Sequence, residues 1–182
     1  MIIQETSIKD LLIIKPRVFT DERGYFFESY NMKSFEDLGI DYPFLQDNQS
    51  LSQKGVLRGL HFQNPPFAQG KLVRVIHGSV IDVAVDIRKN SPTYGKHEKI
   101  FLSGENKKMF WIPPGFAHGF ITLEDNTLFS YKCTALYDKS SEGSIIWNDE
   151  NLNIDWEYPN PLVSSKDQEA TKFEQLDSQF VL

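Results

Sequence analysis

The alternation of apolar and polar positions is most regular in residues 80–88, VIDVAVDIR. Positions 81, 83, 85 and 87 are apolar and alternate with two aspartates, an alanine and an arginine. This period of two predicts a β-strand with one apolar face. The preceding segment, KLVRVIHGS, is rich in β-branched residues and breaks at His77-Gly78-Ser79. The pattern therefore predicts a hairpin between two strands at that break.

Six further segments have short strand-like patterns: LLIIKPRVF, GYFFESY, KHEKIFLS, KMFWIPP, GFITLE and TLFSYKCTALY. They are separated by short breaks of Gly, Asn, Asp or Pro, which mark turns. Helical patterns are scarce. The best one is Met32–Leu38, with Asn31 as its N-cap and Gly39 as its stop, and the polar tail SSKDQEATKFEQLD predicts a second short helix.

Many short strands at close spacing are typical of a sandwich or barrel. We therefore expect an all-β protein, a jelly-roll barrel with a few short peripheral helices. The 182 residues suit one domain, and no repeat, low-complexity tract or linker divides them, so one domain over residues 1–182 is predicted. Hydrophobic residues make up 40% of the chain, which is enough for a sizeable core.

Charge and cysteine content exclude several classes of function. The net charge is −6 and no stripe of Lys or Arg is present, which argues against a nucleic-acid or anionic-membrane partner. No apolar run approaches the ~20 residues of a membrane span, and the first ten residues do not resemble a secretory leader. The single Cys133 excludes an internal disulfide and fits a reducing compartment. We expect a cytoplasmic protein.

Residues 55–78, GVLRGLHFQNPPFAQGKLVRVIHG, nearly fit half of a metal-binding motif. Gly55 stands six positions before His61, a second ligand is expected at position 63, and a Glu would stand seven positions before Gly78. Position 63 is instead Gln, and position 71 is Lys. A neutral amide is a poor ligand for transition metals, and an ammonium group repels a divalent ion.

A second segment, IPPGFAHGF, carries a Pro-x-Gly-x-x-His pattern that ends at His118 and resembles the second half-motif of cupin barrels. The first stretch is similar to the first half-motif, and the two occur in the right order. In metal-binding cupins the four ligand places hold His, His, Glu and His. Here they hold His61, Gln63, Lys71 and His118, so we expect neither a metal nor another cofactor.

An imidazole and an ammonium group in one pocket suit the removal of a proton next to a carbonyl. Histidine exchanges protons near neutral pH, which makes His61 a candidate base. Lys71 would then stabilise the negative charge that moves onto the carbonyl oxygen. Spacing alone does not identify the proton donor among the tyrosines.

Eight segments appear along the chain in a specific order: DERGYFFESY, FLQDNQSLS, GVLRGLHFQ, GKLVRVIHGSVIDVAVDIR, SPTYGKHE, IPPGFAHGF, YKCTALYDKSSEG and WNDENLNIDW. Together they resemble the rhamnose-pathway 3,5-epimerases that act on dTDP-4-dehydro-6-deoxy-D-glucose. The resemblance covers roughly residues 2–170. It implies a cupin jelly roll without metal, a homodimer, and inversion of C3 and C5 on either side of the C4 ketone to give dTDP-4-dehydro-L-rhamnose.

The resemblance also implies residue roles. His61 matches the general base, Asp167 the carboxylate that orients it, and Tyr131 the acid that returns a proton from the opposite face. Lys71 matches the lysine that stabilises the enolate, and Tyr137 the aromatic that stacks on thymine. The remaining substrate-binding positions match Arg23, Glu28, Gln46, Asn48, Arg58, His118, Glu142 and Lys166. The segment of Arg23 is expected to reach across the dimer.

Several alternatives stay open. Arg58 is three residues from His61 and faces the other way on a regular strand, so it joins the site only if a bulge occurs at Gly59. Asp82 faces either the barrel interior or water. The motifs do not separate a 3,5-epimerase from an enzyme that inverts only C3 or only C5. A sugar-nucleotide binding module is disfavoured, because binding needs no base–acid pair, and a metal-dependent oxygenase is least favoured.

Overall fold

The computed structural model describes residues 1–182 and is built mainly of short strands. The strands are β1 (Ile2–Glu5), β2 (Leu12–Lys15), β3 (Val18–Asp21), β4 (Gly24–Phe27), β5 (Gln46–Ser52), β6 (Val56–Gln63), β7 (Lys71–His77), β8 (Ser79–Asp86), β9 (His97–Ser103), β10 (Met109–Ile112), β11 (Phe116–Thr122), β12 (Thr127–Cys133), β13 (Glu142–Ser144) and β14 (Leu162–Val163). The helical segments are α1 (Met32–Asp37), α2 (Ser165–Gln168) and the 3₁₀ turn η1 (Phe173–Gln175). None of these helices has the length needed to cross a membrane.

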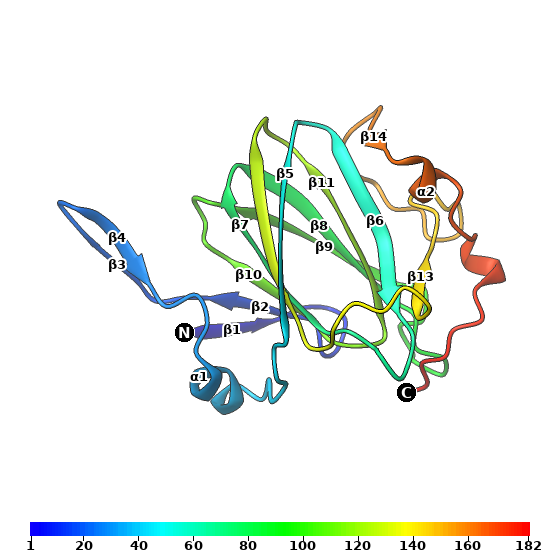
Figure 1. Ribbon diagram of the computed structural model, residues 1–182, viewed down its shortest axis with the longest axis horizontal. Helices are drawn as coiled ribbons and strands as arrows, with labels where there is room; N and C mark the ends of the chain where they lie inside the picture. The colour runs from blue at the N-terminus through cyan, green and yellow to red at the C-terminus, as the bar shows by residue number, and fades with distance from the viewer.

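Two sheets form the walls of a barrel (Figure 1). One has six strands in the order β1-β2-β10-β7-β12-β5, and the other has the order β13-β6-β11-β8-β9, with β14 alongside β6. Almost all neighbouring strands are antiparallel, and most are not consecutive in the chain. The predicted all-β jelly roll with short peripheral helices is confirmed.

The predicted hairpin at His77-Gly78-Ser79 is wrong. β7 pairs with β10 and β12 in one sheet, whereas β8 pairs with β9 and β11 in the other. Both edges of each strand are therefore occupied, and the chain crosses between the sheets at Gly78, whose φ of +79° favours glycine. A break between two apolar runs indicates a turn, but it does not tell which sheet the next strand joins.

The regular alternation in β8 places its apolar face away from the barrel interior. Ile81, Val83 and Val85 pack against the segment after β13, which contributes Trp156 to the same cluster. The opposite face, with residues such as Val80 and Ala84, joins side chains of the facing sheet in the barrel core. Every residue of β8 is consequently buried, and Asp82 faces the inside of the barrel.

The helix predicted at Met32–Leu38 is confirmed as α1, Met32–Asp37, one residue shorter than predicted. The Asn31 side chain accepts a hydrogen bond from the Ser34 N–H, a cap that typically stabilises a helix by about 1 kcal/mol. Gly39 follows with φ of +82°. Phe35 is buried and packs with Trp111 over the outer face of the six-stranded sheet. The second predicted helix is present only as α2 and η1, which an extended stretch separates.

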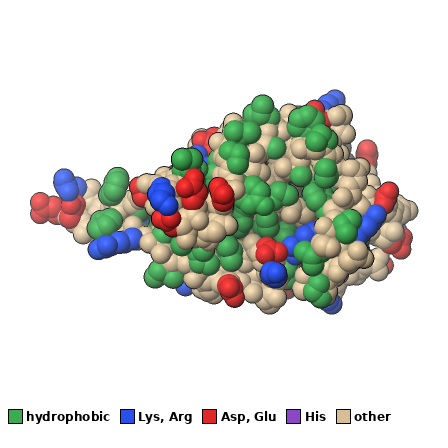
Figure 2. All heavy atoms as spheres, turned by 90° about the horizontal axis from the view of Figure 1, so that it is seen from below, with side chains coloured by type: hydrophobic (Ala, Val, Ile, Leu, Met, Phe, Trp, Pro, Cys, Tyr) green, Lys and Arg blue, Asp and Glu red, His purple; other side chains and the backbone are tan.

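The β3–β4 ribbon projects from the body of the molecule (Figure 1). Its strands pair only with each other, and both are largely exposed. Figure 2 shows charged side chains gathered at its tip, where Arg23 forms an ion pair with Asp21. The ribbon therefore lacks the packing that holds the other strands in place.

Candidate active site

A cavity of about 690 Å³ lies between the two sheets and is lined by residues of both. Eight of the thirteen predicted site residues line it: Asn48, Arg58, His61, Lys71, His118, Tyr131, Lys166 and Asp167. Three more, Gln46, Tyr137 and Glu142, are connected to these by hydrogen bonds, while Arg23 and Glu28 lie elsewhere.

The His61 side chain is held by a carboxylate that is distant in sequence. His61 Nε2 lies 2.6 Å from Asp167 Oδ1, and the Gly59 N–H donates to the other carboxylate oxygen at 3.3 Å. Ser164 caps α2 by accepting from the Asp167 N–H, which places the carboxylate at the cavity wall. Burial raises the pKa of Asp167, but its hydrogen bonds with His61 and Gly59 outweigh this effect and hold the pKa below its usual range. Asp167 is thus an ionised acceptor at neutral pH.

A bulge in β6 brings Arg58 and His61 into the same cavity. His118 lies opposite His61 and Phe120 opposite Arg58, so three steps along β6 match two steps along β11. Gly59 lies at the irregularity with φ of +136°, and a Cβ there would lie 2.5 Å from the Gly119 Cα. Only glycine fits this position. Arg58 was expected to join the site only if a bulge occurred at Gly59, and that bulge is present.

A buried carboxyl group, that of Asp82, lies next to His118. Asp82 is fully buried, and both of its carboxylate oxygens lie 3.0 Å from His118 Nε2. Burial raises the pKa of Asp82, against the opposing effects of His118 and Lys71. Burial lowers the pKa of Lys71, and the neighbouring acidic groups of Cys133, Asp82 and Glu142 oppose this shift. The interior alternative for Asp82 is therefore correct.

Tyr131 stands on the wall opposite His61. It belongs to β12 of the six-stranded sheet, whereas His61 belongs to β6 of the other. Its cross-strand partner is Asn48 on β5. Burial raises the pKa of Tyr131, so the hydroxyl keeps its proton at neutral pH, while Arg58 and Asn48 partly oppose this shift.

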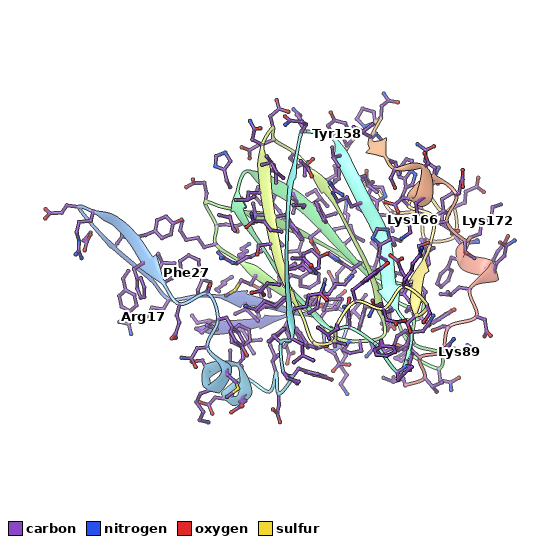
Figure 3. All side chains as sticks on the ribbon, viewed as in Figure 1. Arg17, Phe27, Lys89, Tyr158, Lys166 and Lys172 are labelled. Atoms are coloured by element: carbon purple, nitrogen blue, oxygen red, sulfur yellow. The ribbon has the colours of Figure 1, made fainter.

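Three predicted binding residues, which we call the rim, are joined by polar contacts next to the cavity, and one of them, Lys166, lines it. Lys166 Nζ lies 2.6 Å from Glu142 Oε1, and the Tyr137 hydroxyl donates to the other carboxylate oxygen at 3.1 Å. Figure 3 shows Lys166 next to β6, on the side of α2. The Tyr137 N–H donates to Gln46 Oε1 at 2.8 Å, and Gln46 donates to Asn48. The rim is therefore tied to the strand that carries Asn48.

Arg23 and Glu28 do not reach the cavity of their own chain. Arg23 lies on the exposed turn of the β3–β4 ribbon, where its side chain is 85% exposed. Glu28 follows the ribbon and accepts a hydrogen bond from the Asn31 side chain.

From the sequence alone, Gln63 is notable only as a residue that replaces a metal ligand. Its side chain is buried but does not line the cavity. Its amide instead forms hydrogen bonds with two loops, at Phe67 and at Leu136–Asp138. The spacing of His61 and Gln63 predicts that both side chains share one face of the strand, but only His61 lines the cavity. Gln63 lies at the end of β6, where loops cover it, and strand alternation does not predict the position of loops.

Comparison with known proteins decides the family. Residues 5–175 match the protein family described as dTDP-4-dehydrorhamnose 3,5-epimerase. The chain belongs to this family. The epimerase of Salmonella typhimurium is 56% identical over 177 residues, covering 96% of this chain and 97% of that protein. The one from Shigella flexneri is 55% identical over 174 residues, covering 95% and 96% of the two chains.

Solved structures of the family superpose closely on this chain. The crystal structure of the dTDP-4-dehydrorhamnose 3,5-epimerase from Elizabethkingia anophelis has a TM-score of 0.92 at 52% identity and covers 96% of this chain and 97% of its own. The Legionella pneumophila 3,5-epimerase, solved with dTDP-4-keto-L-rhamnose, has a TM-score of 0.93 at 51% identity and covers 96% and 94% of the two chains. The expected family and its jelly-roll fold are confirmed.

Proposed function

We propose that this chain inverts C3 and C5 of dTDP-4-dehydro-6-deoxy-D-glucose to give dTDP-4-dehydro-L-rhamnose, without a metal or other cofactor. The observation that carries the proposal is the pair formed by the His61–Asp167 dyad and Tyr131 on opposite walls of one cavity. The names of the relatives support both inversions. The named 3'-monoepimerase is only 31% identical, against 51–56% for these 3,5-epimerases.

His61 is the base. Because Asp167 is ionised and accepts from Nε2, it favours the tautomer in which Nδ1 carries a lone pair. A proton next to the C4 ketone transfers to that nitrogen, and the bonding electrons move toward the C4 oxygen. Asp167 then stabilises the imidazolium that forms, so its role depends on His61.

Lys71 stabilises the enolate. Charge that develops on the C4 oxygen is favoured by a buried cation, because the interaction is screened less there than in water. Burial lowers the pKa of Lys71, and the acidic groups around it oppose this effect. Tyr131 donates its hydroxyl proton from the opposite wall, and the carbon is thereby inverted.

The remaining polar residues bind the substrate. Arg58 and Lys166 line the cavity and supply positive charge for the diphosphate. Tyr137 is 55% exposed at the rim, where its ring is available to stack on thymine. The net charge of −6 also favours a small-molecule partner over nucleic acid, and the single thiol fits a cytoplasmic location.

The function is tested by NMR of the protein with dTDP-4-dehydro-6-deoxy-D-glucose in D₂O. Both C3 and C5 should acquire deuterium, and the product should have the L-rhamno configuration. Deuterium at one carbon alone would show a mono-epimerase, and binding without exchange would show a module that performs no chemistry.

Activity is expected to survive exhaustive chelation. The amide of Gln63 is already bonded to two loops, and the position of the ligand Glu holds Lys71. Turnover should be unchanged after treatment with EDTA and removal of the chelator. Loss of turnover that one equivalent of a transition metal restores would contradict the expectation.

We further propose that the protein works as a homodimer in which the ribbon reaches the partner's cavity. The apolar side chains of Phe19, Tyr25 and Phe26 are 51%, 56% and 70% exposed, which suits burial in an interface. Arg23 at the tip of the same ribbon has no contact with its own cavity.

Mixed dimers of Arg23→Ala and His61→Asn chains should therefore regain activity that neither parent has. In each mixed dimer, one site combines the intact His61 of one chain with the intact Arg23 of the other. Activity of refolded mixtures is measured against the unmixed parents, with differently tagged chains to prove that mixed dimers form. Mixed dimers without recovered activity would contradict a shared site.

A further inference from the structure

The Gln63 amide satisfies almost all of its hydrogen-bonding capacity on two loops. Its Nε2 donates to the Phe67 carbonyl at 2.7 Å and to the Leu136 carbonyl at 3.2 Å, and its Oε1 accepts from the Asp138 N–H at 2.9 Å. The side chain is only 4% exposed. A buried amide with three partners is costly to remove, because each partner would be left without its hydrogen bond.

Tyr137 lies between Leu136 and Asp138, the two residues of the second loop that bond to the Gln63 amide. Its backbone N–H is held by Gln46, so three consecutive residues of this loop are fixed by two glutamine side chains. Tyr137 is 55% exposed, and its hydroxyl donates a hydrogen bond to Glu142. Glu142 is itself the cross-strand neighbour of Gln63. The backbone on both sides of the ring is therefore fixed by the two glutamines, and the ring itself has one polar contact, with Glu142.

We propose that Gln63 is a positioning residue for the nucleotide base, acting by holding the Tyr137 loop in its stacking conformation before substrate arrives. The inference rests on the proposed function, because it assigns Tyr137 to the thymine. An exposed ring on an unrestrained loop must be ordered at the moment of binding, and that ordering weakens affinity. Gln63 never touches the substrate or the reacting carbons.

The test uses Gln63→Met, which keeps the length of the side chain and removes all three hydrogen bonds. Affinity for dTDP is measured by calorimetry, together with KM and kcat for the sugar nucleotide. We expect dTDP affinity to fall on the order of tenfold and KM to rise in parallel, with kcat at saturation nearly unchanged. Gln69→Met is the matched control, since Gln69 donates to the Ala135 carbonyl at 2.8 Å without bracketing Tyr137, and it should change dTDP affinity little.

A double-mutant cycle separates positioning from general stability. If Gln63 acts through the tyrosine ring, Gln63→Met should weaken dTDP binding less than about twofold in a Tyr137→Leu background. An equal loss in both backgrounds would overturn the proposal, as would wild-type affinity in the single variant. Gln63→Glu repeats the cycle if the Met variant does not fold, because it keeps the acceptor for the Asp138 N–H and lacks both donors. A wild-type protein that does not bind dTDP would contradict the proposed function instead.

Discussion

His61→Asn lowers kcat by on the order of a hundredfold to ten-thousandfold and leaves substrate affinity almost unchanged. This corresponds to roughly 2.7 to 5.4 kcal/mol of lost transition-state stabilisation. Asparagine occupies similar space and can still donate to Asp167, but its amide cannot accept a proton at neutral pH. Turnover of dTDP-4-dehydro-6-deoxy-D-glucose and the exchange of substrate hydrogens in D₂O should fall together.

Two further variants test the same assignment, one with a smaller expected effect and one as a control. Asp167→Asn should reduce kcat less, because the base remains and only its tautomer and the stabilisation of its charged form are weakened. His77→Asn is the matched control, since His77 is an exposed histidine at the end of β7 outside the cavity. Near-normal turnover of His61→Asn would refute the assignment of the base.

The parts of the fold that the sequence predicted are those with a local apolar pattern. β8 and β12 alternate clearly, and α1 has a cap and a stop. β5 was not predicted as a strand, because its residues, QDNQSLS, are nearly all polar. Asn48, Gln49 and Ser50 on β5 line the cavity, and alternate residues of the strand are exposed, so neither face required a row of apolar side chains.

Which face of a strand is inside depends on what covers the other face. The apolar face of β8 lies beneath a segment that contains Trp156, more than seventy residues later in the chain. Period-two patterning shows that two faces differ, but here it could not show that Asp82 was on the inner one. The same limit explains the incorrect hairpin at Gly78, since both strands have suitable patterns and the pairing was decided by other strands.

In the candidate site, too, the features with a local sequence pattern were predicted from the residues themselves and the others were not. His61 and Lys71 lie in one short motif and His118 in another, and the two motifs together resemble a cupin frame with substituted ligands. Asp167 is 106 residues from His61 and was identified only through family resemblance, because no spacing rule connects them. The bond network of Gln63 was missed, since it involves loop backbone groups that have no sequence signature.

The two proton transfers should be separable by Tyr131→Phe. Inversion requires removal of a proton from one face and its return to the other, so base and acid must be different groups. The positions of His61 on β6 and Tyr131 on β12 meet this requirement. Phenylalanine preserves the ring that packs against the barrel core and removes only the hydroxyl.

In D₂O, the Tyr131→Phe variant should still exchange substrate hydrogens at C3 or C5, because His61 can return a deuteron to the face from which it took the proton. Inversion should fall much further than exchange, and comparing deuterium uptake with product formation by NMR measures the difference. Lys71→Ala should instead slow both processes together, because the enolate lies on both paths. Tyr158→Phe, a tyrosine next to Gly55 and outside the cavity lining, should change neither. If Tyr131→Phe inverts C5 at the wild-type rate, Tyr131 is a packing residue and another group in the cavity donates the proton.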